Sequence, residues 1–177
     1  MDENQLKTLQ DWLKTQDEHY TIQELRELKE LNLSDKQPPI SYIPGEIALL
    51  KKLEILHLNN NHLQSLPVEV CKLTNLKELW SMYGRFSSLP DEIGQLKNLE
   101  KIDLSNNHLK SLPASTGKLT KLKILWLSYN QLTALPPEIK NLSSLQELYL
   151  DGNPFPLRDR ETIEKYFPDC LIDWEIQ

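Results

Sequence analysis

The side chains that could do chemistry are few in this chain of 177 residues. No serine, cysteine or lysine stands beside a residue that would activate it as a nucleophile. The five glycines do not form a loop that could cradle a phosphate. The potential metal ligands of the repeats do not converge, because His62 and His108 share a column but are two repeats apart, and His57 falls in another column. His19 lies near the N-terminus, and Cys71 and Cys170 are far apart along the chain. The sequence therefore predicts no catalytic residue, no metal site and no cofactor, and the chain is not expected to be an enzyme.

Aromatic and acidic side chains that recur at a fixed interval are better candidates for a functional site. Trp126 and Tyr149 are 23 residues apart, and 23 is also the interval at which leucines repeat. Tryptophan, tyrosine and methionine are enriched at the centres of protein interfaces. We therefore predict a partner-binding site that consists of Trp80, Trp126, Tyr149, Tyr83, Tyr129, Asp103, Met82, Ile124, Ile55, His57, Glu78, Lys101 and Glu147.

These residues are positioned by six segments of the form L-x-x-L-x-L-x-x-N-x-L. The segments begin at Leu28, Leu53, Leu76, Leu99, Leu122 and Leu145. The first step is 25 residues and the others are 23, and we expect the excess in the turn at 36–39. A fixed period in this range is typical of a solenoid, in which each repeat buries its apolar residues against its neighbours.

The six segments resemble the leucine-rich repeat family over roughly residues 25–158. The links Leu89–Ile93, Leu135–Ile139 and Leu66-Pro67 with Val70 are similar to the 23-residue intracellular subtype, found in Ras-binding scaffold proteins, plant relatives and many bacterial proteins. The resemblance implies an α/β fold: a right-handed leucine-rich repeat solenoid, shaped as a horseshoe arc, with a concave parallel sheet. It also implies short helical or 3-10 turns on the convex side and helical caps at both ends.

Alternation along each short strand places the candidate site on the concave face. In the fourth repeat Ile102 and Leu104 are expected to point inward and Asp103 outward, because successive side chains of a strand face opposite ways. An asparagine where the chain leaves a strand can bond the turn backbone of its own and the next repeat. We assign this structural role to Asn61, Asn107, Asn130 and Asn153.

The third repeat departs from the pattern at two positions. Ser81 replaces a core leucine and Gly84 replaces the asparagine. One explanation is a degenerate repeat in which Trp80 or Met82 turns partly inward. The other is a locally altered strand that reshapes the binding face.

The two ends are expected to cap the solenoid, which gives one continuous domain. Residues 1–24 form an N-terminal helical cap, 25–158 the six repeats and 159–177 a C-terminal cap. Thr21 and Glu24 have the spacing of a capping box. A helix is expected over 159–167, with Leu171, Ile172 and Trp174 against the last strand. A partner-binding helix is the alternative for the N-terminal segment.

The face predicts the chemistry of its partner. Trp80 and Trp126 flank Asp103, so a lysine or arginine of the partner could pair with Asp103 between the two rings. We expect a protein or peptide with apolar anchors and a basic group. A carbohydrate is the alternative ligand, since flat rings beside acidic and amide side chains also suit sugars. Self-association through the same face is a further alternative, although a monomer is expected.

Composition also bears on whether the chain binds nucleic acid or a membrane, and on its cellular compartment. The 26 acidic and 20 basic residues give a net charge of −6, which disfavours nucleic acid. No apolar run approaches the ~20 residues of a membrane span, and no secretory signal is seen. We expect two reduced thiols and a cytoplasmic protein, with non-classical secretion, or delivery into a host cell as a bacterial effector, as the alternative.

Overall fold

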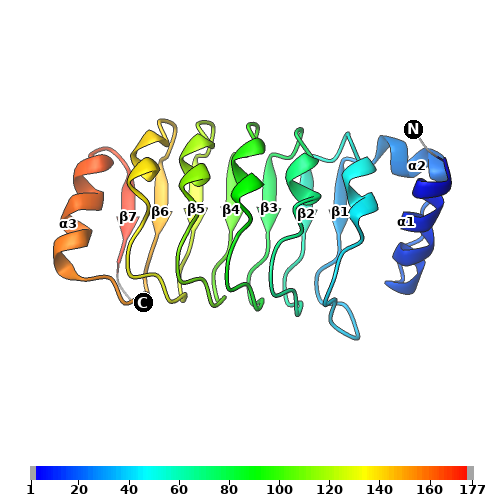
Figure 1. Cartoon of the computed structure of the whole chain (residues 1–177), viewed down its shortest axis with the longest axis horizontal. Helices are drawn as coiled ribbons and strands as arrows, with labels where there is room; N and C mark the ends of the chain where they lie inside the picture. The colour runs from blue at the N-terminus through cyan, green and yellow to red at the C-terminus, as the bar shows by residue number, and fades with distance from the viewer. Residues whose placement is uncertain (1–2, 175–177) are drawn as a thin grey trace.

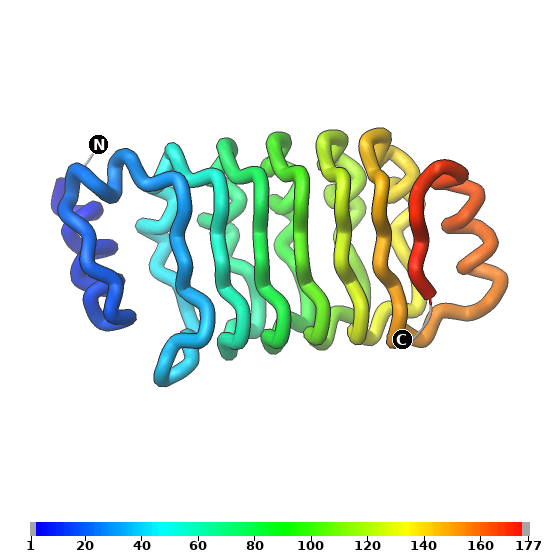
Figure 2. The backbone as a smooth tube through the Cα atoms, turned by 180° about the vertical axis from the view of Figure 1, so that it is seen from behind, coloured from blue at the N-terminus to red at the C-terminus, as the bar shows by residue number. Residues whose placement is uncertain are grey.

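The computed structural model describes residues 3–174, which form one row of stacked coils (Figures 1 and 2). Seven parallel strands pair in chain order to form one sheet. Their bounds are β1 Glu30–Asn32, β2 Ile55–His57, β3 Glu78–Trp80, β4 Lys101–Asp103, β5 Ile124–Trp126, β6 Glu147–Tyr149 and β7 Leu171–Asp173. The register advances by whole repeats, so that Leu56 pairs with Leu79 and Leu79 with Ile102.

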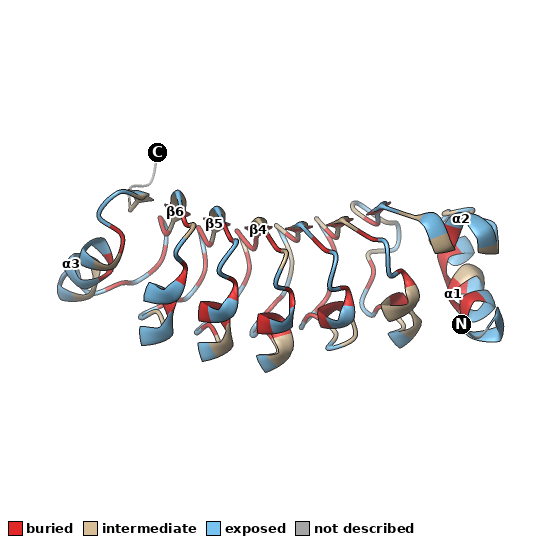
Figure 3. Ribbon diagram, turned by 90° about the horizontal axis from the view of Figure 1, so that it is seen from above, coloured by how far each residue is buried: buried red, intermediate tan, exposed pale blue. Residues whose placement is uncertain are grey.

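A short 3-10 helix returns the chain on the opposite side of each coil. These turns are η1 Gly45–Leu49, η2 Val70–Lys72, η3 Asp91–Gln95, η4 Ala114–Lys118 and η5 Pro137–Asn141. Proline precedes four of the five turns and fixes the backbone angle from which a helical turn can start. Viewed from above, the strands line the gently concave side and the turns the other side (Figure 3). The predicted solenoid architecture is confirmed.

The core is a continuous stack of leucines between these two layers. The strand leucines, such as Leu56, Leu79 and Leu125, are all buried, as are Leu99 and Leu122 before the strands. No single coil could bury these side chains alone, because each lies against the coils on both sides. In β1–β6 the residues flanking the central apolar residue of each strand therefore lie on the outer side of the sheet, and only Asp103 among them is buried.

Buried asparagines close the turn after each regular strand. Asn130 Nδ2 donates to the carbonyls of Leu104 and Leu127, both at 2.9 Å, and its Oδ1 accepts from the amide of Leu109 at 3.0 Å. Asn61, Asn107 and Asn153 make the equivalent bonds, which confirms their predicted structural role.

The strand of the third repeat is not altered, and Trp80 does not turn inward. β3 keeps the regular register with both neighbours, and Trp80 lies on the outer face of the sheet. Ser81 is buried at the leucine position, while Phe86 is fully buried where three other repeats have leucine. The larger phenylalanine thus adds apolar volume to the repeat that has lost a leucine.

Helices lie at both ends of the row (Figure 1). At the N-terminal end, α1 (Glu3–Thr15) buries Leu6, Leu9, Trp12 and Leu13, and α2 (Ile22–Glu27) begins with the predicted capping box. At the other end, α3 (Leu157–Tyr166) buries Ile163 and is followed by β7, which pairs with β6. The C-terminal segment therefore contributes a seventh strand of its own to the sheet.

Candidate protein-binding face

We call the sheet face the surface formed by outward side chains of β1–β7 and of the three residues after each of β1–β6. Its centre is a row of rings, one from each of four strands, which we call the aromatic row: His57, Trp80, Trp126 and Tyr149. The ring centroids of His57 and Trp80 are 6.3 Å apart, those of Trp80 and Trp126 5.4 Å, and those of Trp126 and Tyr149 5.8 Å. All four residues are half-buried, so the row lies on the sheet and not in the core.

Carboxylates along one side of the aromatic row hold the polar atoms of its rings. Glu78 accepts a hydrogen bond from Trp80 Nε1 at 3.0 Å, and Glu147 accepts one from the Tyr149 hydroxyl at 2.8 Å. The bond to Glu147 raises the pKa of Tyr149, because it favours the protonated phenol. These bonds fix the orientation of the rings before any partner arrives.

Asp103 is not open to pair with a cation of a partner, although the sequence had suggested this pairing. It belongs to β4, between the two tryptophan strands, but Trp80 and Trp126 meet each other above it. Asp103 is only 3% exposed, and its Oδ1 accepts from the amide of Ser105 at 2.9 Å. Burial raises the pKa of its carboxyl, against the hydrogen bonds from Ser105, which lower it. The predicted cation site between the two rings is therefore closed in this structure.

Two tyrosines form a second, more exposed part of the face. Tyr83 is 55% exposed and Tyr129 is 44% exposed. Both have left-handed backbone angles, with φ of 54°. The equivalent positions in the other repeats carry residues that tolerate this conformation: Asp35, Asn60, Asn106 and Gly152. A tyrosine is strained there, and backbone strain of this kind is concentrated at functional sites.

The remaining predicted residues flank the aromatic row. Ile55 and Ile124 are half-buried at the start of their strands, and Met82 is half-buried after β3. Lys101 donates to Glu78 at 3.0 Å, so the one lysine of the sheet face is already paired. The structure thus brings all the predicted residues to one face, but Asp103 lies beneath it.

Sequence reasoning missed Asp151 and Gly152, which follow β6. Asp151 accepts a hydrogen bond from the Ser128 hydroxyl, and Gly152 lies under the Tyr129 ring. The sequence signal near this pair is Tyr129. The column that holds Asp35, Asn60 and Asn106 is a turn position, so a tyrosine in it is unexpected on local grounds.

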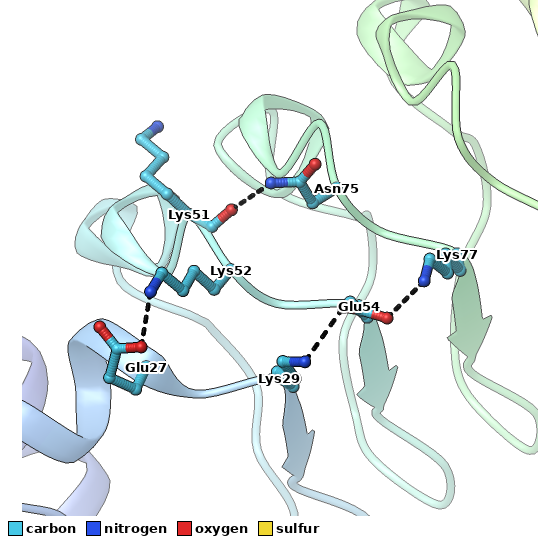
Figure 4. A network of polar contacts seen from close by, with 7 residues as sticks. All are labelled: Glu27, Lys29, Lys51, Lys52, Glu54, Asn75 and Lys77. Carbon is cyan, nitrogen blue, oxygen red and sulfur yellow. Dashed lines mark hydrogen bonds and ion pairs between the residues drawn. The ribbon is translucent and has the colours of Figure 1, made fainter.

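A ladder of alternating charges runs beside the strands, at the residue just before each (Figure 4). Glu54 lies 3.9 Å from Lys29 and 2.5 Å from Lys77, while Lys52 pairs with Glu27. The bond from Lys77 lowers the pKa of Glu54. Opposite charges neutralise each other along this edge, and exposed pairs of this kind are solvated and contribute little. The charge of the sheet face differs, because most of its carboxylates face no lysine or arginine.

Other potential sites are weaker. A hollow of about 620 Å³ lies between α3 and β7, lined by both polar and apolar side chains. Arg85 is 3.1 Å from the ring of His62, which places a cation beside that histidine. Within residues 3–174, no group of three or more His, Cys, Asp or Glu could hold a metal ion. No helix in this range is long and apolar enough to cross a bilayer.

Two family models match the chain. One, described as a leucine-rich repeat region, covers residues 81–154, and a single leucine-rich repeat model covers residues 52–73. No match was found among curated protein sequences.

Several solved structures are also similar to this chain. A leucine-rich repeat protein of Leptospira interrogans is 44% identical, with a TM-score of 0.82 over 88% of this chain and 40% of that one. The plant peptide hormone receptor RGFR1, solved with RGF2, is 30% identical, with a TM-score of 0.64 over 76% of this chain and 22% of that one. An internalin of Listeria monocytogenes, 22% identical, shares the fold with a TM-score of 0.74 over 88% of this chain and 45% of that one. The chain thus spans less than half of each of these proteins.

Proposed function

We propose that this chain, which is a leucine-rich repeat protein, is a non-catalytic binding module that holds a peptide or protein on its sheet face. The observation that carries the proposal is the aromatic row, flanked by two tyrosines in strained backbone conformations. The leucine core is complete without these rings, so their place on the surface has no structural requirement. Contiguous exposed aromatic surface marks interaction sites.

The comparisons support the same class of function. One solved relative is a peptide hormone receptor in complex with its peptide. That ligand belongs to the plant protein, and its relevance here is that a protein of similar fold is a receptor for a peptide hormone. The partner of the present chain is expected to supply apolar side chains to the aromatic row and at least one basic group.

The stacking within the aromatic row favours a protein over a sugar. Trp126 and Tyr149 are nearly parallel, with 17° between their planes, and His57 and Trp80 differ by 14°. Each ring of the row has a neighbouring ring on at least one side, which reduces the ring face that is open to a ligand. A hexose needs an open ring face, whereas apolar side chains can pack against the edges and the remaining faces.

Affinity capture tests the proposal directly. Wild type and a Trp80→Ala/Trp126→Ala variant are immobilised and exposed to the same extract, and captured proteins are compared. Tyr42→Ala is the matched control, since Tyr42 is an exposed aromatic residue in the loop before η1 and packs against Trp12 of α1.

We expect proteins that wild type and the Tyr42→Ala control retain and the double variant loses. Equal capture by all three, with the double variant folded, contradicts binding at the aromatic row. A glycan array probed with the same three proteins separates the carbohydrate alternative, which predicts glycan signals that only the double variant loses.

A further inference from the structure

Asp151 is the carboxylate of the sheet face that is best placed to receive a charged group from a partner. It is 9% exposed, and its Oδ1 accepts from the Ser128 hydroxyl. Its Oδ2 meets no hydrogen-bond donor within residues 3–174, and it is not among the side-chain oxygens sealed from solvent. A carboxylate that is nine-tenths buried, with one oxygen unpaired, lacks a compensating charge.

Aromatic rings lie on both sides of this carboxylate. Tyr149, two residues earlier, faces the same side and stacks on Trp126. On the other side, the Tyr129 ring lies over Gly152, where a Cβ atom would be 2.7 Å from Tyr129 Cδ1. Gly152 therefore provides the space that the Tyr129 ring occupies, and the ring is held close to Asp151.

The two strained tyrosines differ in this respect. Tyr83 has an asparagine, Asn106, at the neighbouring turn position, whereas Tyr129 has the glycine. Only Tyr129 is thus accommodated by a missing side chain in the next repeat. The strained backbone and the glycine together hold one ring beside the carboxylate of Asp151, whose Oδ1 alone is hydrogen-bonded within residues 3–174.

The charges of the sheet face agree with a cationic ligand group. Its only lysine or arginine is Lys101, which is bound to Glu78. Its acidic residues are Glu30, Asp35, Glu78, Asp103, Glu147, Asp151 and Asp173. A basic side chain that enters this face is attracted by the whole surface, and it gains a direct partner only at a free carboxylate oxygen.

We infer that Asp151 is the cation subsite of the sheet face. A lysine or arginine side chain of the bound peptide pairs with Asp151 Oδ2 and lies between the Tyr129 ring and the Trp126–Tyr149 stack. This inference rests on the proposed function and adds to it the position of the basic group. Cations over aromatic faces and beside desolvated carboxylates are held more tightly than at exposed carboxylates.

Peptide display supplies the probe for a test. Short random peptides are selected on the wild-type chain, with removal of those that the Trp126→Ala variant also retains. The enriched peptides are synthesised and titrated into wild type, Asp151→Asn and Glu138→Gln. Asparagine can still accept from Ser128, so the Asp151→Asn fold is preserved, and Glu138→Gln removes one exposed charge from η5, on the opposite side of the solenoid.

We expect every enriched peptide to carry an arginine or lysine, and Asp151→Asn to weaken binding about 10-fold while Glu138→Gln changes it little. Exchange of the basic residue for glutamine weakens binding to wild type by the same factor and has no further effect on Asp151→Asn. If the enriched peptides bind wild type and Asp151→Asn with the same affinity, this inference is overturned and the proposed function remains intact. If no peptide separates wild type from Trp126→Ala, the proposed function fails, and the inference fails with it.

Discussion

At the turn after each strand, four of the five repeats from the second to the sixth carry an asparagine with the same set of bonds, whereas the aromatic row changes from one repeat to the next. Its column reads His57, Trp80, Asp103, Trp126 and Tyr149. The turn position is buried and must satisfy backbone groups of two coils, so one residue type fits. The strand position faces outward, and the solenoid accepts many residues there. Its identities are therefore free to be determined by binding.

Two positions sharpen this contrast. The left-handed residue of each turn is also dictated by the backbone, which is why four of the six repeats place Asp, Asn or Gly there. Tyr83 and Tyr129 occupy that position against its conformational preference. A tyrosine at this position exposes its ring on the sheet face but strains the backbone. The expected result is a lower free energy of unfolding.

The largest expected effect is on stability and comes from the asparagine turns after the strands. Asn130→Ala removes the acceptor of the Leu109 amide and the donor of two carbonyls, all buried, so the free energy of unfolding should fall by about 3 kcal/mol. Urea unfolding followed by circular dichroism measures it. Asn141→Ala, at an exposed asparagine of η5, is the control and should change little. Equal effects of the two substitutions would remove the distinction between the two regions.

The second largest expected effect is on partner affinity and comes from a substitution on the sheet face. Trp126→Ala should weaken partner binding by about 2 kcal/mol, because aromatic anchors dominate protein interfaces. Unfolding should change by only about 1 kcal/mol, from loss of contacts with Trp80 and Tyr149. Isothermal calorimetry with a captured partner or a selected peptide, beside a urea titration, separates the two quantities. An unfolded variant would place Trp126 in the core and contradict the assignment of the face.

Much of the fold was predictable because leucine and asparagine at fixed spacing admit one stacking solution. The sheet order, the inward leucines and the N-terminal capping box all follow from local patterns. Contacts between side chains two repeats apart do not. Trp80 and Trp126 are separated by β4, and no spacing rule states that their rings meet above Asp103. The sequence places residues in columns, but the conformations of large side chains decide which of those residues are accessible.

Asp151 is the opposite case, a residue whose role in the site could not be predicted from its column. Apart from Met82, its column consists of small polar residues, and nothing in it distinguishes Asp151 from Ser105 or Ser128 as a binding residue. Its environment depends on the left-handed Tyr129 and on the space over Gly152, and both are properties of the folded chain. The seventh strand was likewise only partly predictable, since Leu171–Asp173 carries no repeat pattern.

A smaller effect tests the strained tyrosines. Tyr129→Asn should raise the free energy of unfolding by about 1 kcal/mol, because asparagine tolerates the left-handed conformation far better. Asn106→Tyr is the reverse exchange at the same turn position and should lower it by a similar amount. Thermal unfolding of both variants measures the two changes. If Tyr129→Asn also weakens peptide binding, stability and binding oppose each other at this residue, and a loss of stability would instead show that the ring supports the fold.

The smallest expected effect is a pH dependence at Asp103, which belongs to the face by sequence and to the interior by burial. Burial raises the pKa of its carboxyl in the folded chain above the unfolded value of about 3.9, so the folded state binds this proton more tightly. The stability that depends on this group is therefore full below the unfolded pKa and falls as the pH rises through the folded pKa. Asp103→Asn keeps an acceptor for the Ser105 amide and avoids the buried charge.

The variant should thus be more stable than wild type at pH 7, with a difference that shrinks as the pH approaches 3.9. Urea titrations of both proteins across this range measure the difference. Ser105→Ala should enlarge the advantage of the Asp103→Asn exchange, because the Ser105 side chain also lowers the pKa of Asp103. A difference that does not vary with pH would mean that the carboxylate is as well solvated in the folded chain as in the unfolded one. In that case the two tryptophans do not seal Asp103, and the cation site predicted between them would again compete with Asp151.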